Sequence, residues 1–152
     1  MQARTETIGE LSIRAYRPAD LEAVADCWLR ASRVGHPFLS DEELARQQAL
    51  LRSTYLPQAQ SWVVEERGRV IGFISLMEAF IGGLFVSPQA HGRGIGRSLI
   101  EHVGRSRPRL SVEVYLDNPI APAFYRRCGF RPVGGTRYDD EGWPLELLRR
   151  GR

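Results

Sequence analysis

The residues from Leu84 to Ile100, LFVSPQAHGRGIGRSLI, combine a strand-like run, a glycine-rich turn and a helical pattern. The apolar run ends at Val86, where Ser87-Pro88 stops it, and glycines then alternate through Gly92-Arg93-Gly94-Ile95-Gly96. The first turn of a helix carries backbone N–H groups without intrahelical partners and a partial positive charge. A strand, a glycine turn and a helix in this order therefore predict a binding site for a phosphate group.

Two common phosphate-binding motifs do not fit this segment. A P-loop requires Gly-Lys followed by Ser or Thr, but all 21 basic residues of the chain are arginines. A Rossmann fingerprint has the spacing G-x-G-x-x-G near the first strand of the fold. Gly92, Gly94 and Gly96 are instead spaced G-x-G-x-G, beyond the middle of the chain. Because such a turn also occurs without a ligand, further residues are needed to identify one.

Length and composition are those of a globular domain with one core. We expect the 152 residues to form a single domain, 1–152. The net charge of +3 comes from dispersed arginines, so no nucleic-acid partner is expected. No apolar run is long enough to span a membrane, and the first residues do not resemble a signal peptide, which predicts no membrane partner and a cytoplasmic location. Cys27 and Cys128 fit no metal-ligand spacing, so we expect two reduced structural thiols and no metal.

The rest of the chain predicts alternating strands and helices in a mixed sheet, of α/β or α+β class. Gly82-Gly83 within a strand indicates either a bulge or a close approach of another backbone, and Pro57 is expected to end the helix before it. The expected strands are Leu11–Tyr16, Ser61–Glu66, Val70–Met77, Phe80–Val86, Leu110–Leu116, Arg131–Tyr138 and Leu145–Leu148, and the expected helices are Pro18–Val34, Asp41–Tyr55, Gly94–Arg105 and Ile120–Cys128.

A second motif lies downstream and reads NPIAPAFYRRCGF from Asn118 to Phe130. It resembles the N-x-x-A-x-x-F-Y-x-x-x-G-F pattern of the GCN5-related N-acetyltransferase (GNAT) superfamily. The glycine loop resembles that superfamily's Q/R-x-x-G-x-G/A motif, except that His91 replaces Gln or Arg. The segment from His36 to Ser40, together with the turn from Asp139 to Gly142, resembles a small bacterial YjaB-like group.

The resemblance implies a GNAT-like fold, with a mostly antiparallel sheet, about four flanking helices and splayed central strands. It also implies acetyl-CoA as cosubstrate. Its pantetheine arm is expected to pair with backbone groups of Phe85 and Val86, and a backbone N–H near Phe85 is expected to stabilise the oxyanion. The pyrophosphate is expected on the loop, whose residues are His91, Gly92, Arg93, Gly94, Ile95, Gly96 and Arg97. Arg93 and Arg97 either add charged contacts or are ordinary surface arginines.

Three further roles complete the expected chemistry. Asn118 either binds the cofactor or is a turn asparagine before Pro119. The resemblance implies Tyr125 as the general acid that protonates the departing thiolate. The general base is left open between Glu78, His36 and water.

The resemblance thus implies an acetyl-CoA-dependent N-acetyltransferase that acts by direct transfer in a ternary complex. The expected acceptor is a primary amine, either a protein lysine or N-terminus or a small molecule. A non-catalytic coenzyme A-binding domain is the alternative, and an acetylating toxin acting on charged tRNA is less consistent with the dispersed arginines. Residues 18–55 are the expected acceptor-side wall, and its aromatic residues Trp28, Phe38 and Tyr55 either line the site or belong to the core. The acidic turn Asp139–Glu141 either attracts a cationic acceptor or is a solvated loop. The chain is expected to be a monomer or homodimer, and a preference for another acyl-CoA stays open.

Overall fold

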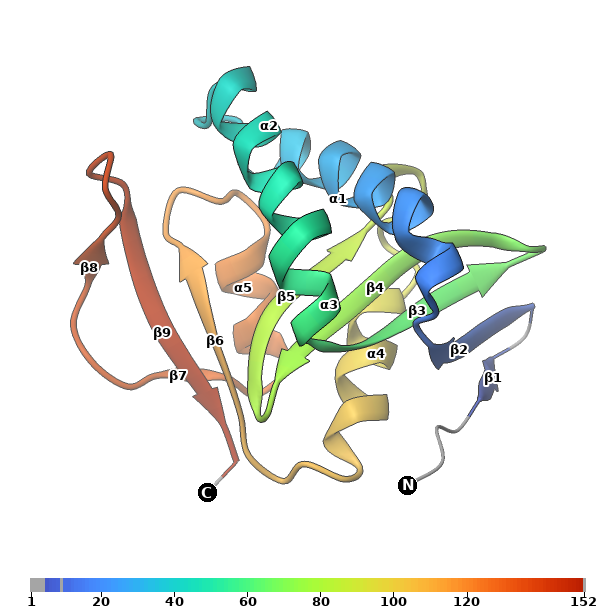
Figure 1. Ribbon diagram of the computed structural model, residues 1–152. Helices are drawn as coiled ribbons and strands as arrows, with labels where there is room; N and C mark the ends of the chain where they lie inside the picture. The colour runs from blue at the N-terminus through green and yellow to red at the C-terminus, as the bar shows by residue number, and fades with distance from the viewer. Residues whose placement is uncertain (1–4, 9, 152) are drawn as a thin grey trace.

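The computed structural model describes residues 5–8 and 10–151 (Figure 1). A mixed sheet separates two layers of helices, with α1, α2 and α3 on one face and α4 and α5 on the other. The helices are α1 (Leu21–Gly35), α2 (Asp41–Leu50), α3 (Leu56–Gln58), α4 (Ile95–Gly104) and α5 (Ala121–Arg127). The strands are β1 (Glu6–Ile8), β2 (Leu11–Ala15), β3 (Gln60–Glu66), β4 (Arg69–Met77), β5 (Phe80–Val86), β6 (Leu110–Tyr115), β7 (Arg131–Pro132), β8 (Arg137–Tyr138) and β9 (Pro144–Arg150).

The strand order is β1-β2-β3-β4-β5-β6-β9-β7, and β8 also pairs with β9. Within the described residues, β5 and β6 are the one parallel pair, and all other neighbours are antiparallel. This arrangement confirms the predicted fold, a mostly antiparallel sheet flanked by helices.

The two central strands separate soon after they meet. Parallel pairing of β5 with β6 is limited to Phe80 opposite Ser111 and Ile81 opposite Val112. Figure 1 shows the two strands diverging from this point, with α5 behind the gap. On its other side β5 pairs fully with β4, but Ser75 faces Gly83 while Leu76 faces Ile81, so Gly82 is an extra residue. The predicted splay and the glycine bulge are both confirmed.

Alternation along the strands divides the core between the two faces of the sheet. Phe73 packs in the cluster beneath α1 and α2, whereas Ile74 packs in the cluster beneath α4 and α5. Side chains on a strand point alternately to opposite faces, so Ser75 and Met77 lie on the same face as Phe73. The residues of β5 and β6 that face α2 therefore line one side of the gap, and those that face α5 line the other.

Three parts of the chain differ from the predictions. The three-residue strand β1 was not predicted, because it is too short to show an alternating pattern. The second helix does not stop before Pro57: a π-helical turn, Leu51–Tyr55, leads into α3, and Pro57 occupies its first turn, where a missing N–H is tolerated. The predicted strand Arg131–Tyr138 is wrong as one element, since it is interrupted between β7 and β8 around Gly134-Gly135.

Candidate active site

An open cleft of about 1000 Å³ runs through the gap between β5 and β6 and reaches both faces of the sheet. The glycine loop and the start of α4 line one end of it, and Tyr55 and Met77 line the other. Of the predicted site residues the cleft brings together ten: Phe85, Val86, His91, Gly92, Gly94, Ile95, Gly96, Arg97, Asn118 and Tyr125. Arg93 is not part of the lining, because its guanidinium pairs with the carboxylate of Glu66.

The glycine loop turns sharply into α4. Gly92 and Gly94 have φ angles of 80° and 76°, and Gly94 is the N-cap of α4 without any capping side chain. The N–H groups of the first helical turn therefore have no partner within the helix. A Cβ on Gly96 would lie 3.0 Å from the ring of Phe124, so this glycine allows α4 and α5 to approach closely. The backbone N–H donors at the start of α4, together with glycines that have no side chain to obstruct them, fit a pyrophosphate.

His91 ties this loop to the preceding strand. Its Nε2 donates a hydrogen bond to the carbonyl oxygen of Val86, at 2.9 Å. The N–H of Ser87 donates to the carbonyl oxygen of Ile71 on β4. Because hydrogen-bonded and non-hydrogen-bonded pairs alternate along antiparallel strands, the carbonyl of the preceding residue, Val86, points away from β4. Although histidine departs from the family motif at this position, its ring still holds the loop against the strand.

The same alternation shows which peptide groups of β5 face the gap. Those of Leu84 and Val86 point toward it, and those of Phe85 point to β4. Phe85 contributes its ring instead, which stacks on Phe73 with 5.6 Å between centroids. Leu84 was not among the predicted residues, because the bulge at Gly82 sets the alternation and its exact position is not visible in the sequence.

Tyr125 lies on the α5 side of the gap. Its side chain is 5% exposed, and its ring meets those of Phe124 and Phe130 edge-on, with centroids 5.1 and 5.2 Å away. Burial raises the pKa of this phenol well above its usual range, so it is protonated at neutral pH. A protonated phenol that borders the cleft can donate a proton to a leaving group there.

Asn118 forms a turn just before the helix that carries Tyr125. Its Oδ1 accepts hydrogen bonds from the N–H groups of Ile120 and Ala121, at 2.8 and 2.9 Å. The turn-asparagine alternative is therefore present in the structure, and the side-chain NH₂ group lies beside Gly35, which also lines the cleft. Arg97 links α4 to α5, since its guanidinium donates a hydrogen bond to the carbonyl oxygen of Arg127 at 2.9 Å.

The two candidate bases occupy different places. Glu78 is exposed in the turn between β4 and β5, with a φ of 56°, and is not part of the cleft lining. His36 lines the cleft and lies among the rings of Phe38, Phe85 and Tyr115. Burial lowers the pKa of His36 to about 4, and its Nδ1 has no hydrogen-bond partner among the described residues. The imidazole is therefore neutral at physiological pH.

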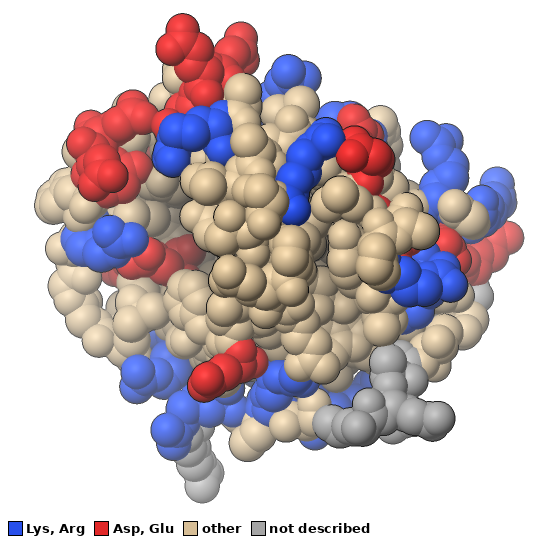
Figure 2. Space-filling view, viewed as in Figure 1, with Lys and Arg blue, Asp and Glu red and all other residues tan. Residues whose placement is uncertain are grey.

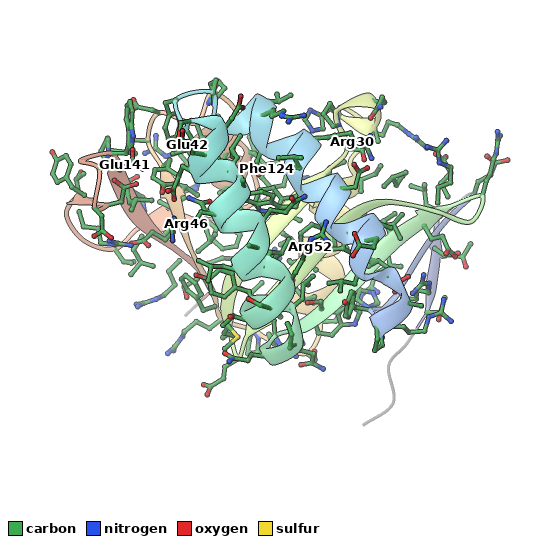
Figure 3. The ribbon with its side chains drawn as sticks, turned by 45° about the horizontal axis from the view of Figure 1, so that its top comes forward. Arg30, Glu42, Arg46, Arg52, Phe124 and Glu141 are labelled. Carbon is green, nitrogen blue, oxygen red and sulfur yellow. The ribbon has the colours of Figure 1, made fainter. Side chains whose placement is uncertain are left out.

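Carboxylates gather beside the cleft, between α2 and the turn before β9. Figure 2 shows acidic side chains gathered at the upper left, and Figure 3 shows Glu42 and Arg46 on the side of α2 that is turned toward Glu141. A second cavity of about 290 Å³ lies here and shares Arg46, Gln47 and Tyr115 with the main cleft. The Tyr115 hydroxyl donates to Asp139 Oδ2 at 2.9 Å, which anchors the acidic turn to β6.

Comparison with known proteins identifies the family. The acetyltransferase (GNAT) domain model matches residues 57–132. The chain belongs to this family of acetyl-CoA-dependent N-acetyltransferases, which transfer an acetyl group to an amine.

Two relatives from Escherichia coli K12 match almost the whole chain. The peptidyl-lysine N-acetyltransferase YiaC is 38% identical over 90% of this chain and 94% of its own length. The peptidyl-lysine N-acetyltransferase YjaB is 37% identical over 91% and 94%. The solution structure of apo YjaB from E. coli superposes with a TM-score of 0.82 at 35% identity and covers 93% of this chain and 99% of its own. The resemblance drawn from the two motifs is thereby confirmed.

Among residues 5–8 and 10–151, no group of three or more His, Cys, Asp or Glu side chains is arranged to hold a metal ion. No helix within these same ranges has the length and apolar character needed to cross a membrane.

Proposed function

We propose that this chain acetylates lysine side chains of polypeptides. The observation that carries the proposal is the similarity to two peptidyl-lysine N-acetyltransferases over nine-tenths of the chain. The second cavity, which adjoins the cleft, supports it, because the carboxylates of Glu43, Asp139, Asp140 and Glu141 line it beside a single arginine, Arg46, and attract a cationic side chain.

Acetyl-CoA supplies the activated acetyl thioester, and residues of this chain are assigned to three tasks. The N–H groups of Ile95, Gly96 and Arg97 bind the pyrophosphate at the N-terminus of α4. The gap-facing carbonyl oxygen of Leu84 and the N–H of Val86 pair with the amide-bearing pantetheine arm, as an added strand would, and the Val86 carbonyl is bound by His91. The N–H of Leu84, rather than that of Phe85, is assigned to stabilise the oxyanion.

Proton transfers are divided between the two faces of the gap. Tyr125 donates a proton to the departing thiolate from the α5 side. On the other side, the amine proton leaves through water in the open cleft. Glu78 lies outside the lining, and a histidine with a pKa of about 4 is a weak base, so neither is assigned this task.

Three acceptors offered in parallel test the proposal. The first is a peptide with one lysine and a blocked N-terminus, the second is a lysine-free peptide with a free N-terminus, and the third is a small primary amine. Mass spectrometry after incubation with acetyl-CoA is expected to show acetylation of the first well above the other two. Preferential acetylation of the free N-terminus or of the small amine would contradict the proposal.

A further inference from the structure

Two apolar side chains are exposed at the end of the cleft away from the glycine loop. Tyr55 is 53% exposed and Met77 is 46% exposed, and both line the cleft. Phe80, also exposed, is the register partner of Met77 across the β4–β5 hairpin. We call Tyr55, Met77 and Phe80 the apolar shelf. Exposed apolar groups that adjoin one another and a reaction cleft are characteristic of binding surfaces.

The π-helical turn explains why Tyr55 is exposed. The N–H of Leu56 donates to the carbonyl oxygen of Leu51, five residues earlier, and both leucine side chains are buried. In a regular α-helix the residue four positions after Leu51 would share its buried face, and that residue is Tyr55. The wider turn places Leu56 in the core and turns the tyrosine ring to the cleft. Such single π turns are frequent at functional sites.

The shelf lies on the acceptor side of the sheet. Met77 shares the α2 face with Phe73, because the two are four residues apart on β4, and Tyr55 comes from the helical layer above that face. The phosphate-binding loop and α4 occupy the other end of the cleft. A ligand that reaches the shelf therefore enters from the same side as the acceptor amine.

We propose that the apolar shelf binds an apolar side chain of the acceptor polypeptide, close in sequence to the target lysine. This inference rests on the proposed function, because a small amine would leave the shelf in water. A flexible thioether and an aromatic ring form an adaptable contact for Leu, Ile, Val, Met or Phe. The shelf would then select among lysines by the residues beside them.

Two peptides of equal length and charge test the inference, one with leucine and one with serine next to the lysine. The wild-type chain is expected to acetylate the leucine peptide with a kcat/KM about tenfold higher, the effect of covering part of one apolar side chain. In Tyr55→Ser and Met77→Ser the ratio between the two peptides is expected to fall toward one. Tyr138→Ser is the matched control, since Tyr138 is 63% exposed on β8 and is not part of the cleft lining, and it is expected to keep the tenfold ratio.

The outcomes separate this inference from the function on which it rests. Equal kcat/KM for the two peptides in the wild-type chain overturns the shelf while lysine acetylation stands. Acetylation of a small amine but of neither peptide overturns both. A second copy of the chain is the other possible occupant of the shelf, and light scattering tests for it. If the wild-type chain is a dimer and Tyr55→Ser makes it a monomer, the shelf is a contact between two copies and the inference is wrong.

Discussion

The imidazole Nε2 of His91 lies 2.9 Å from the carbonyl oxygen of Val86, so the glycine loop is hydrogen-bonded to the end of β5. Loop and strand carry the two sets of backbone groups assigned to the cosubstrate, the pyrophosphate donors and the gap-facing peptides. One side chain therefore holds the two sets at a fixed spacing.

Removing this hydrogen bond is expected to weaken acetyl-CoA binding. His91→Ala should raise the KM for acetyl-CoA about fivefold, since a single hydrogen bond contributes about 1 kcal/mol. His91→Gln retains an N–H donor and is expected to stay within about twofold of the wild-type KM. Steady-state kinetics with acetyl-CoA as the varied substrate provides the measurement. If glutamine performs no better than alanine, the hydrogen bond has no such role.

Tyr125→Phe is expected to lower kcat about 100-fold, because general acid catalysis contributes factors of this size. The phenylalanine ring keeps the contacts with Phe124 and Phe130, so the fold and the affinity for acetyl-CoA should be unchanged. Initial-rate assays measure kcat, and calorimetric titration with acetyl-CoA measures the affinity separately. Tyr138→Phe, at an exposed tyrosine, is the control and should retain full turnover. Equal kcat in Tyr125→Phe and the wild-type chain would rule out the acid role.

Gly94→Ala tests the left-handed cap of α4. An L-residue at a φ of 76° is strained by about 1 kcal/mol, so the free energy of unfolding should fall by this amount and Tm by about 3 °C. Gly134→Ala is the matched control, because Gly134 has no left-handed φ and a Cβ there meets nothing within 4 Å. Thermal unfolding of both variants gives the comparison, and an equally large loss of stability in the control would remove the argument from φ.

Stability is expected to fall as pH drops from 6.5 toward 4. Burial lowers the pKa of His36 from its ordinary 6.5 to about 4 in the folded chain, so the unfolded state binds more protons in this window. The contribution is complete above pH 6.5 and decreases by about 3 kcal/mol by pH 4. Chemical denaturation across this range measures it. His36→Phe should flatten the slope, and an unchanged slope in that variant would assign the pH dependence to other groups.

The glycine loop and α4 were predictable because their signals are local. A glycine is required where φ is positive, and the apolar spacing of the following residues defines the helix. The pairing of two motifs then indicated the family and, with it, the splayed sheet. Each of these features depends on residues that are neighbours in the chain.

The parts of the site that could not be predicted depend on the exact number of residues within a strand or turn, or on a partner that is distant in the sequence. One extra residue in β5 decides that Leu84 rather than Phe85 turns its peptide groups to the gap. A five-residue turn decides between the two places left open for Tyr55, the cleft and the core, and turns its ring to the cleft. Arg93 turned away from the cleft because Glu66, at the end of β3, supplies a carboxylate. Local propensities do not encode such relationships.

The separation of β5 from β6 also gives the sheet two further edges, one on each strand, placed in its interior. An exposed edge normally invites pairing with another chain, and proteins protect their outer edges with charges, bulges or short strands. Here the unpaired peptide groups line a cleft inside the sheet, with the α2 layer over one face and α5 over the other. An edge in this position is offered to a ligand that carries amide groups of its own, so the device that other proteins guard against at their borders becomes a means of recognition.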